Sequence, residues 1–447
     1  MSTEATVEKD VPVTTPVLTR RDFLITTAAT AVAVSVAGGC AGPPRARPGP
    51  FVRPGGIGPE RIRVGLIGCG GRGIGAVKDC VKASANVEVV ALGDLFQDRV
   101  DEARTKLAEL GENYWVTEDH CFTGFDNYQG VLSSPVDLVI LATPPGFRPV
   151  HLQAAMEAGK HVFMEKPVAV DPVGVRSVIA SSELARQKGL AIVAGTQRRH
   201  EPSYLETMKR IHAGAIGDIV AAQCYWNQGD LWVKPHEPEW SDMEWQCRNW
   251  LYFTWLSGDH IVEQHVHNLD VINWALRATP VKAVGLGGRQ VRTGPEYGNV
   301  YDHFCIEYEY PKGVRVLSMC RQIKGTSERV AERLVGTRGV SNPNGVIERR
   351  GKRVYEYKAK GEPVNPYVQE HVDLINGIRQ SRPLNEGRRI AESTLTAILG
   401  RMSAYTGREL SWDWVMNASL LDLSPPCYEL GDLAVEPVAV PGQTPLV

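Results

Sequence analysis

The fold of this chain is decided by residues 61–73, RIRVGLIGCGGRG. Residues 61–67 are a short apolar run, which is typical of a buried parallel strand. The glycine-rich turn leads into a helical pattern that extends to Lys82, and a second apolar run at 87–92 ends in Gly93-Asp94. A G-x-G-x-x-G turn between a strand and a helix, with an acidic residue about twenty positions further on, predicts a dinucleotide-binding Rossmann domain.

Each residue type in this motif has a physical reason. Gly68 permits the tight turn, Gly70 lets the backbone approach a pyrophosphate, and Gly73 lets the helix pack closely against the strand. Asp94 would accept hydrogen bonds from the adenosine ribose hydroxyls and repel a 2′-phosphate, so the sequence favours NAD over NADP. The alternative is a glycine-rich turn without a ligand, in which Asp94 is only a cap.

Later apolar runs bring polar residues to the same edge of the predicted sheet. Strands are predicted at 136–141 and 161–164, which end in the sequences ATPP and EKP, and at 191–194. Because the carboxyl ends of parallel strands face the ligand crevice, Thr143 and Lys166 should lie there. A lysine in such a crevice can contact a reacting oxygen, although a surface salt bridge is an equally good interpretation.

Together these motifs resemble the Gfo/Idh/MocA oxidoreductase family over about residues 60–420, and the Glu-Lys-Pro signature at 165–167 is the most specific part. The resemblance implies an α/β Rossmann domain followed by an α+β domain with an open, largely antiparallel sheet. That sheet would carry the substrate site and the interface of a homo-oligomer. Lys166 would lie beside the nicotinamide and the substrate hydroxyl. The predicted cofactor-binding residues are Gly68, Gly70, Gly71, Arg72, Gly73, Asp94, Thr143, Pro144, Glu165 and Lys166.

The second half of the chain has a different pattern, with strands that lie close together in sequence and suggest a meander. The predicted strands are 219–226, 281–287, 304–310 and 314–319. Helices are predicted at 369–379 and 388–405, and we expect both to pack back against the sheet.

Residues 258–270, GDHIVEQHVHNLD, are the most informative part of this second domain. As one helix they would place Asp259, Glu263, His267 and Asp270 on a single stripe, where His267 is suited to act as a general base. The resembled family has a similar helix with Asp-x-x-x-His-x-x-Asp, in which Glu263 here replaces the first Asp. One alternative is a metal site built from histidines 260, 265 and 267 with Glu263, and another is a structural His267. No metal is predicted, because neither this spacing nor the cysteine spacing fits a common zinc motif.

Six of the ten tryptophans lie between residues 226 and 255, which favours a carbohydrate site because aromatic faces stack on sugar rings. Ordinary packing is the alternative for each tryptophan taken singly. The predicted substrate-binding residues are Arg198, His200, Trp226, Asp270 and Tyr367.

The N-terminus carries a predicted export signal. Residues 19–24, TRRDFL, precede an apolar stretch and resemble a twin-arginine export signal, with an amphipathic helix as the alternative. Residues 37–40, AGGC, resemble a lipoprotein processing site, so Cys40 is a possible lipid anchor, and simple cleavage is the alternative. The predicted organisation is a signal segment (1–40), a Pro/Gly-rich arm (41–60), a Rossmann domain (61–195), a substrate and oligomerisation domain (196–423) and a Pro-rich tail (424–447).

Composition excludes other classes of protein. Hydrophobic residues make up 43% of the 447 residues and charged residues 22%, which is ordinary for globular domains. The net charge of -2 does not favour a nucleic-acid partner. The most apolar stretch, 23–39, is short and terminal, so a multi-pass membrane protein is excluded.

The sequence therefore predicts an exported NAD-dependent oxidoreductase, periplasmic or membrane-anchored facing the periplasm, that acts on a sugar or glycoside. His267 would take the hydroxyl proton, Lys166 would stabilise the oxygen and Glu263 would tune His267. Two alternatives remain open: an NAD-dependent glycosidase that oxidises, eliminates, adds water and reduces, and a non-catalytic protein that binds sugar or NAD.

Overall fold

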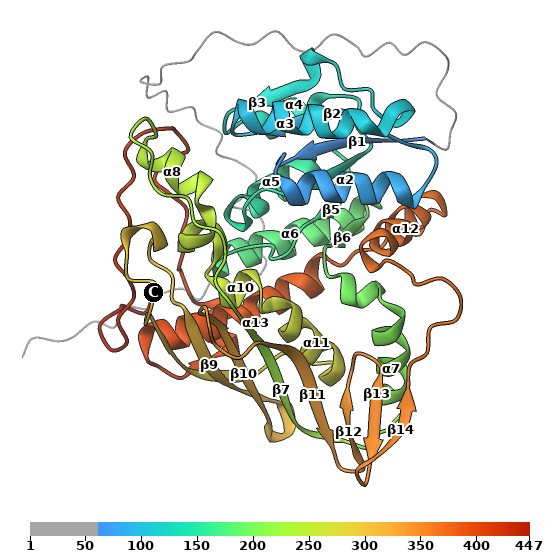
Figure 1. Cartoon of the computed structure of the whole chain (residues 1–447), viewed down its shortest axis with the longest axis vertical. Helices are drawn as coiled ribbons and strands as arrows, with labels where there is room; N and C mark the ends of the chain where they lie inside the picture. Colours follow the sequence, from blue (N-terminus) through green and yellow to red (C-terminus); the bar gives the residue numbers. More distant parts are fainter. Residues whose placement is uncertain (1–60) are drawn as a thin grey trace, which may run out of the picture. The chain divides into compact units, whose positions relative to one another are not determined.

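Strand order identifies the first domain of the computed structural model, which describes residues 61–447. A six-stranded parallel sheet has the order β3-β2-β1-β4-β5-β6, which is a Rossmann topology and confirms the prediction (Figure 1). Its strands are β1 (Ile62–Ile67), β2 (Val87–Asp94), β3 (Cys121–Thr123), β4 (Leu138–Leu141), β5 (His161–Met164) and β6 (Ile192–Ala194). Strand order reverses between β1 and β4, and a ligand crevice is expected at this point.

Helices cover both faces of this sheet. One apolar cluster joins α2, α3 and α12 to one face, and a second joins α4, α5 and α6 to the other. The helices are α2 (Gly71–Ala83), α3 (Gln97–Leu107), α4 (Asn127–Ser133), α5 (Arg148–Glu157), α6 (Pro172–Lys188) and α12 (Pro366–Arg379). The prediction that residues 369–379 pack against the second sheet is wrong. Leu374 and Ile375 of α12 instead lie in the core beside α2, so the chain returns to the first domain.

The second domain contains a nine-stranded sheet of order β14-β13-β12-β11-β7-β10-β9-β8-β15. The predicted meander is present as β8-β9-β10. β10 pairs with β7 in parallel and the other strand pairs of this sheet are antiparallel, so the sheet is open and largely antiparallel, as predicted. Its strands are β7 (Ile219–Gln228), β8 (Lys282–Gly288), β9 (His303–Tyr310), β10 (Val314–Gln322), β11 (Arg329–Gly336), β12 (Gly339–Asn342), β13 (Val346–Arg349), β14 (Lys352–Glu356) and β15 (Leu410–Ser411).

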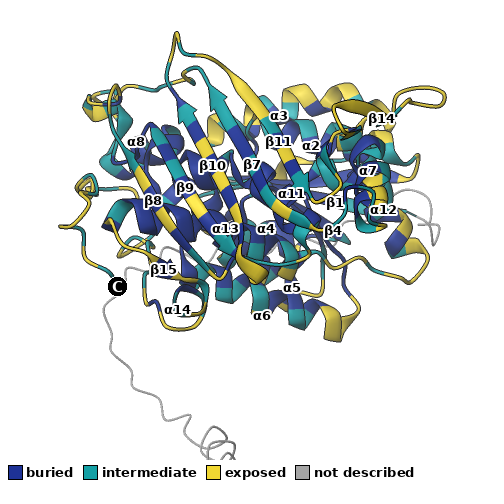
Figure 2. Ribbon diagram, turned by 90° about the horizontal axis from the view of Figure 1, so that it is seen from below, coloured by how far each residue is buried: buried dark blue, intermediate teal, exposed yellow. Residues whose placement is uncertain are grey.

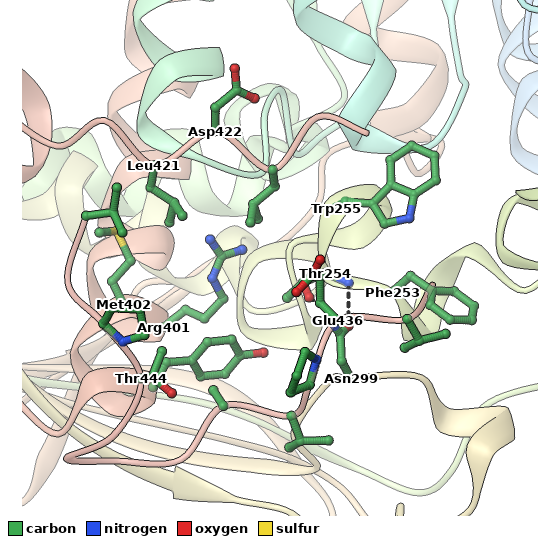
Figure 3. A pocket seen from close by; sticks show the side chains of 18 of the residues that line it. Phe253, Thr254, Trp255, Asn299, Arg401, Met402, Leu421, Asp422, Glu436 and Thr444 are labelled. Atoms are coloured by element: carbon green, nitrogen blue, oxygen red, sulfur yellow. Dashed lines mark hydrogen bonds between the residues drawn. The ribbon is translucent and has the colours of Figure 1, made fainter. Parts of the chain in front are cut away.

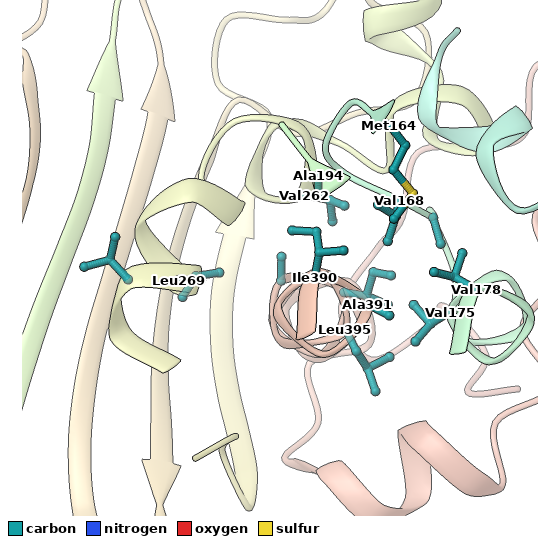
Figure 4. Close-up of a cluster of buried hydrophobic side chains, with 14 of the residues drawn as sticks. Met164, Val168, Val175, Val178, Ala194, Val262, Leu269, Ile390, Ala391 and Leu395 are labelled. Carbon is teal, nitrogen blue, oxygen red and sulfur yellow. The ribbon is translucent and has the colours of Figure 1, made fainter. Parts of the chain in front are cut away.

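One long helix, α13 (Gly387–Thr406), joins the two domains. As predicted it packs on the second sheet, where it contacts β8 and β9. Its other side faces α6, so Ile390, Ala391 and Leu395 lie between Val175 and Val178 on one side and α11 on the other (Figure 4). The domains therefore share one continuous apolar core, and side chains at their junction are held firmly. The remaining helices are α7 (Pro202–His212), α8 (Asp242–Arg248), α9 (Thr254–Ser257), α10 (His260–Glu263), α11 (Val266–Leu276) and α14 (Trp412–Asn417).

The predicted Pro-rich tail after Ser424 forms no helix or strand, but it packs against the rest of the chain. Gln246 donates to the carbonyl of Leu433 (2.7 Å) and Tyr301 to that of Ala439 (2.8 Å). The tail and the body enclose a cavity of about 630 Å³ that includes Arg401 (Figure 3).

The predicted twin-arginine signal, Cys40 and the predicted arm at 41–60 lie outside the described residues. Within residues 61–447, no helix has the length and apolar character needed to cross a bilayer.

Candidate active site

The glycine turn is fixed by contacts that only glycine permits. At Gly68 φ is +101°, and an added Cβ would lie 2.5 Å from the backbone nitrogen of Thr143. A Cβ on Gly73 would lie 2.0 Å from the carbonyl oxygen of Gly68. By contrast, a Cβ on Gly70 or Gly71 would meet nothing within 4 Å, because both residues face open space. The turn thus combines two tightly packed glycines with two that leave room for a ligand beside the N-terminus of α2.

That room is a cavity of about 450 Å³. The predicted cofactor residues that line it are Gly68, Gly70, Gly71, Arg72, Asp94, Thr143 and Pro144. Asp94 accepts hydrogen bonds from the backbone nitrogens of Cys69 (2.7 Å) and Phe96 (3.1 Å), and burial raises the pKa of its carboxyl. These features fit an adenine dinucleotide. Gly70 and Gly71 leave room for it, the N-terminus of α2 has no acidic residue in its first turn, and a carboxylate stands at the end of β2.

Arg72 and Glu165, both predicted to bind the cofactor, are bonded to each other. Arg72 Nε lies 2.5 Å from Glu165 Oε1, and Arg72 Nη2 lies 3.4 Å from Glu370 Oε1 on α12. Burial, together with the charge of Glu165, raises the pKa of Glu370 well above its usual range. The guanidinium carbon of Arg72 also lies 5.1 Å from the centre of the Tyr367 ring. Sequence reasoning missed Glu370, because nothing near Glu370 in sequence indicates that α12 returns to the first domain.

Lys166 reaches the second domain. Its Nζ donates to the carbonyl oxygen of Glu263 (2.5 Å) and lies 3.0 Å from Glu263 Oε1. Both side chains are about nine-tenths buried, at 11% and 9% exposure. The prediction that Glu263 acts on His267 is therefore corrected: Glu263 contacts Lys166. The ammonium group is held at the end of β5, where the two domains meet.

The helix predicted through residues 258–270 is broken into α10 and α11. Asp259 precedes α10 with φ +71°, and its carboxylate accepts hydrogen bonds from the backbone nitrogen of Tyr301 (2.7 Å) and the hydroxyl of Tyr405 (2.6 Å). The single stripe is therefore wrong. Asp259 faces the core of the second domain rather than Glu263 and His267.

His267 is buried and neutral. Burial and the positive charges of Lys166 and Arg198 lower the pKa of its imidazole well below the usual value. Its ring stacks on Trp226 with centroids 5.8 Å apart and an interplanar angle of 20°. The guanidinium of Arg198 lies 5.7 Å from the centre of the same tryptophan and pairs with buried Glu332. Three predicted site residues are thus brought together, and no residue in 61–447 hydrogen-bonds the His267 ring.

Two other predicted substrate residues lie in ion-pair networks. Asp270 Oδ2 lies 2.8 Å from Arg199 Nε, and Asp270 Oδ1 lies 3.0 Å from Arg389 Nη1. His200 Nδ1 lies 2.6 Å from Asp373 Oδ2. Although burial opposes it, hydrogen bonds with Asp373 and Glu386 raise the pKa of His200 to about 9. These partners give Asp270 and His200 a structural role in joining helices, which does not favour the prediction that they contact substrate.

The histidines of the alternative metal site do not converge. His260 Nδ1 faces Asp259 at 3.0 Å, and His265 Nε2 faces the hydroxyl of Ser318 at 2.8 Å. His267 instead faces Trp226. The broken helix thus points the three rings at different partners.

The tryptophans also separate into groups. Trp226 lies at His267, whereas Trp232 and Trp250 line the dinucleotide cavity. Trp240, Trp245 and Trp255 pack in a satellite apolar cluster with Phe253 and Leu256. Their clustering in sequence therefore does not make one carbohydrate surface.

Fold and site together define a two-domain Rossmann protein in which a lysine from one domain meets a carboxylate from the other. Two family models match the chain: "Oxidoreductase family, NAD-binding Rossmann fold" over residues 62–196 and "GFO/IDH/MocA C-terminal domain" over residues 204–341. The chain belongs to the Gfo/Idh/MocA family.

Curated relatives match over part of their length. A scyllo-inositol 2-dehydrogenase (NAD(+)) of Bacillus subtilis is 23% identical over 63% of this chain and 73% of its own. A glycosyl hydrolase family 109 protein of Streptomyces niveus is 27% identical over 66% of this chain and 59% of its own. The chain spans only 45–73% of the length of the first three curated relatives that it matches.

Solved structures share the fold. The aldose-aldose oxidoreductase of Caulobacter crescentus superposes with a TM-score of 0.61 and 18% identity, over 78% of this chain and 99% of the other.

Proposed function

We propose that the protein is an NAD-dependent oxidoreductase that acts on a CH–OH group of a sugar, glycoside or related ring polyol. The observation that carries the proposal is the pairing of Lys166 with Glu263 across the domain junction, beside the neutral His267. When bound, the nicotinamide would supply hydride acceptance and donation. The chain itself supplies orientation and proton transfer.

The roles follow from the charges. A neutral imidazole can accept the proton of a substrate hydroxyl, so His267 is the proposed base. The Lys166 ammonium is the proposed hydrogen-bond donor to the same oxygen, and it favours the negative charge that develops there. Glu263 acts through Lys166, since its carboxylate and its carbonyl oxygen both hold the ammonium. Trp226 offers an aromatic face beside His267 for a ring substrate.

The substrate class is supported by the names of relatives. The matched proteins include an inositol dehydrogenase, and the matched structures include an aldose-aldose oxidoreductase. A cyclic polyol and a pyranose both present a secondary hydroxyl on a ring with apolar faces. Such a ring suits a site formed by Trp226, Arg198 and His267.

The test uses the purified full chain with its native cofactor. Mass spectrometry of the denatured protein should detect NAD, and nicotinamide absorbance should change when an oxidisable sugar or inositol is added. Recovery of NADP alone would overturn the argument from Asp94. A bound cofactor that no polyol in a broad panel reduces would overturn the proposed activity.

A second candidate is an NAD-dependent glycosidase with no net redox change. The similarity to a glycosyl hydrolase family 109 protein favours it. Such an enzyme would release the aglycone from a glycoside while reduced cofactor does not accumulate. Accumulation of an oxidised sugar in proportion to reduced cofactor would exclude it.

We also propose export through the twin-arginine system, with Cys40 as a possible lipid anchor, on the basis of residues 19–40. Replacement of Arg20 and Arg21 by lysine should keep the precursor in the cytoplasm. Palmitate labelling that depends on Cys40 would support the anchor, and normal export of the double variant would contradict the signal.

A homo-oligomer is proposed through the open face of the second sheet. Helices cover only one face of this sheet, and the other exposes apolar residues such as Val284, Leu286 and Leu317 (Figure 2). Leu286 is 75% exposed, so Leu286→Glu should leave the fold intact. We expect this variant to reduce the molar mass measured by light scattering. An unchanged mass would argue against this interface.

A further inference from the structure

The dinucleotide cavity has a wall that the Rossmann domain does not supply. Trp232, Lys234, Arg248 and Trp250 line the same cavity as Gly70 and Asp94. All four belong to residues 229–252, the segment after β7 that includes α8 and that we call the strap. The sequence suggested a sugar site for its tryptophans, whereas two of them, Trp232 and Trp250, lie at the cofactor crevice.

Arg248 attaches the strap to the Rossmann domain. Its Nη1 and Nη2 lie 3.1 Å from the two carboxylate oxygens of Asp98, and its guanidinium carbon lies 3.8 Å from the centre of the Phe96 ring. Glu244, one turn earlier on α8, holds Arg248 Nε at 2.9 Å. Because Phe96 and Asp98 lie two and four residues after Asp94, the strap lies at the end of the crevice where a Rossmann domain binds the adenosine ribose.

The strap is also braced internally. The Tyr252 hydroxyl donates to the carbonyl of Trp232 (2.9 Å). The backbone nitrogen of Lys234 donates to Asn249 Oδ1 (2.9 Å), and Trp245 donates to the Lys234 carbonyl (3.0 Å). The backbones that carry Trp232 and Lys234 are thus fixed before a ligand arrives, which reduces the entropy lost on binding.

Arg99 and Arg248 at this wall are paired with carboxylates, namely Glu102 for Arg99 and Asp98 and Glu244 for Arg248. By contrast, no carboxylate within residues 61–447 forms an ion pair with Lys234, which lines the cavity near Arg99 and Arg248. Burial and these two arginines lower the pKa of Lys234. An anion in the cavity would remove this repulsion, and a dinucleotide carries two phosphates. Trp232, 46% exposed at the rim, offers a face for a base or ribose.

We propose that the strap is a second cofactor-binding element that closes the adenosine end of the crevice. Arg248 attaches the strap to the Rossmann domain, and Lys234 and Trp232 contact the dinucleotide. The role of the strap is to slow NAD release, which an enzyme working outside the cytoplasm needs if free NAD is scarce there. The proposal rests on the proposed function, since it requires NAD to be the ligand.

The test measures release of NADH from the purified full chain. Quenching of tryptophan emission by bound NADH reports occupancy, and a chase with excess NAD gives the dissociation rate. Arg248→Ala should raise that rate about tenfold, which corresponds to about 1.4 kcal/mol. The charge swap Asp98→Arg with Arg248→Asp should restore slow release. The matched control is Arg353→Ala, which removes the exposed ion pair with Glu356 on β14 and should leave the dissociation rate of NADH unchanged.

Two further variants separate folding from binding. Trp232→Ala alters a half-exposed side chain, so it should fold normally yet release NADH faster. Lys234→Met should weaken binding and make the affinity less sensitive to salt, whereas Lys234→Arg should not. If wild type binds NADH and all strap variants release it at the wild-type rate, the strap proposal is wrong and the proposed function stands. If wild type binds no dinucleotide, both are overturned.

Discussion

The glycine turn at 68–73 and the segment 258–270 form the two halves of the proposed active site, but they are built differently. The turn depends on contacts of the backbone with itself, such as the close approach of Gly73 to Gly68. In 258–270 each carboxylate has a partner far away in sequence: Glu263 pairs with a residue 97 positions away, and Asp259 with one 146 positions away. A steric motif of closely packed glycines therefore forms the cofactor half of the proposed site, and long-range ion pairs and hydrogen bonds hold the proposed reacting half.

The largest effect is expected at the reacting half. His267→Ala should lower the rate of cofactor reduction about 10²–10⁴-fold, because it removes the proposed base, and should leave NAD bound. Single-turnover reduction by a reactive polyol measures this rate. In wild type the acid limb of the pH profile should lie well below the usual histidine range, since the pKa of His267 is lowered.

The control for this variant is His303→Ala, which changes a histidine that is 43% exposed. Cofactor reduction by His267→Ala at the wild-type rate would show that His267 is structural.

The glycine turn should respond in a different way. Gly73→Ala should lower the free energy of unfolding by about 1–3 kcal/mol, since its Cβ would meet the carbonyl of Gly68 at 2.0 Å. Gly70→Ala meets no neighbour, so the melting temperature should stay unchanged while NAD affinity falls. Thermal unfolding and NAD titration of both variants test this. Equal effects on stability would contradict the division of roles within the turn.

The Lys166–Glu263 pair links both halves. Glu263→Gln keeps a hydrogen-bond acceptor but leaves a nearly buried Lys166 charge unpaired, so stability should fall by about 1–2 kcal/mol. The double variant Lys166→Met with Glu263→Leu should regain stability and remain inactive. Denaturant unfolding and turnover are measured in parallel. A double variant that regains activity would remove Lys166 from the mechanism.

The smallest effect is expected at His200. Its pKa is raised to about 9 in the folded state, above the usual value of 6.5, so the folded state holds the proton more tightly. The stabilisation is complete below pH 6.5 and is lost as the pH rises through 9. We expect a loss of about 1 kcal/mol, because Asp373 is 36% exposed and solvent screens the pair. His200→Gln should remove this pH dependence, and an unchanged profile would contradict it.

Sequence patterns were sufficient wherever the relevant contacts are local. Strand 161–164 and the strands that begin at Ile219 and Val314 follow from apolar runs, and the glycines define the cofactor turn. The same reasoning failed for 258–270, where a helical spacing predicted one stripe. The chain breaks between α10 and α11, and Asp259, which precedes α10, bonds instead to Tyr301 and Tyr405, contacts that no spacing rule contains.

The sequence alone determined the Rossmann domain, the cofactor class and the position of Lys166 at a strand end, because glycine sterics and strand ends act over a few residues. His267 is a site candidate through the family resemblance, since the helical stripe that also indicated it is wrong. Only the tertiary structure decided that Glu263 holds Lys166, that α12 returns to the first domain, and that the strap lines the cofactor cavity. These features depend on which charged groups meet in a nearly dry interior. A charged side chain buried there needs an oppositely charged partner, and the fold supplies one from a distant part of the sequence.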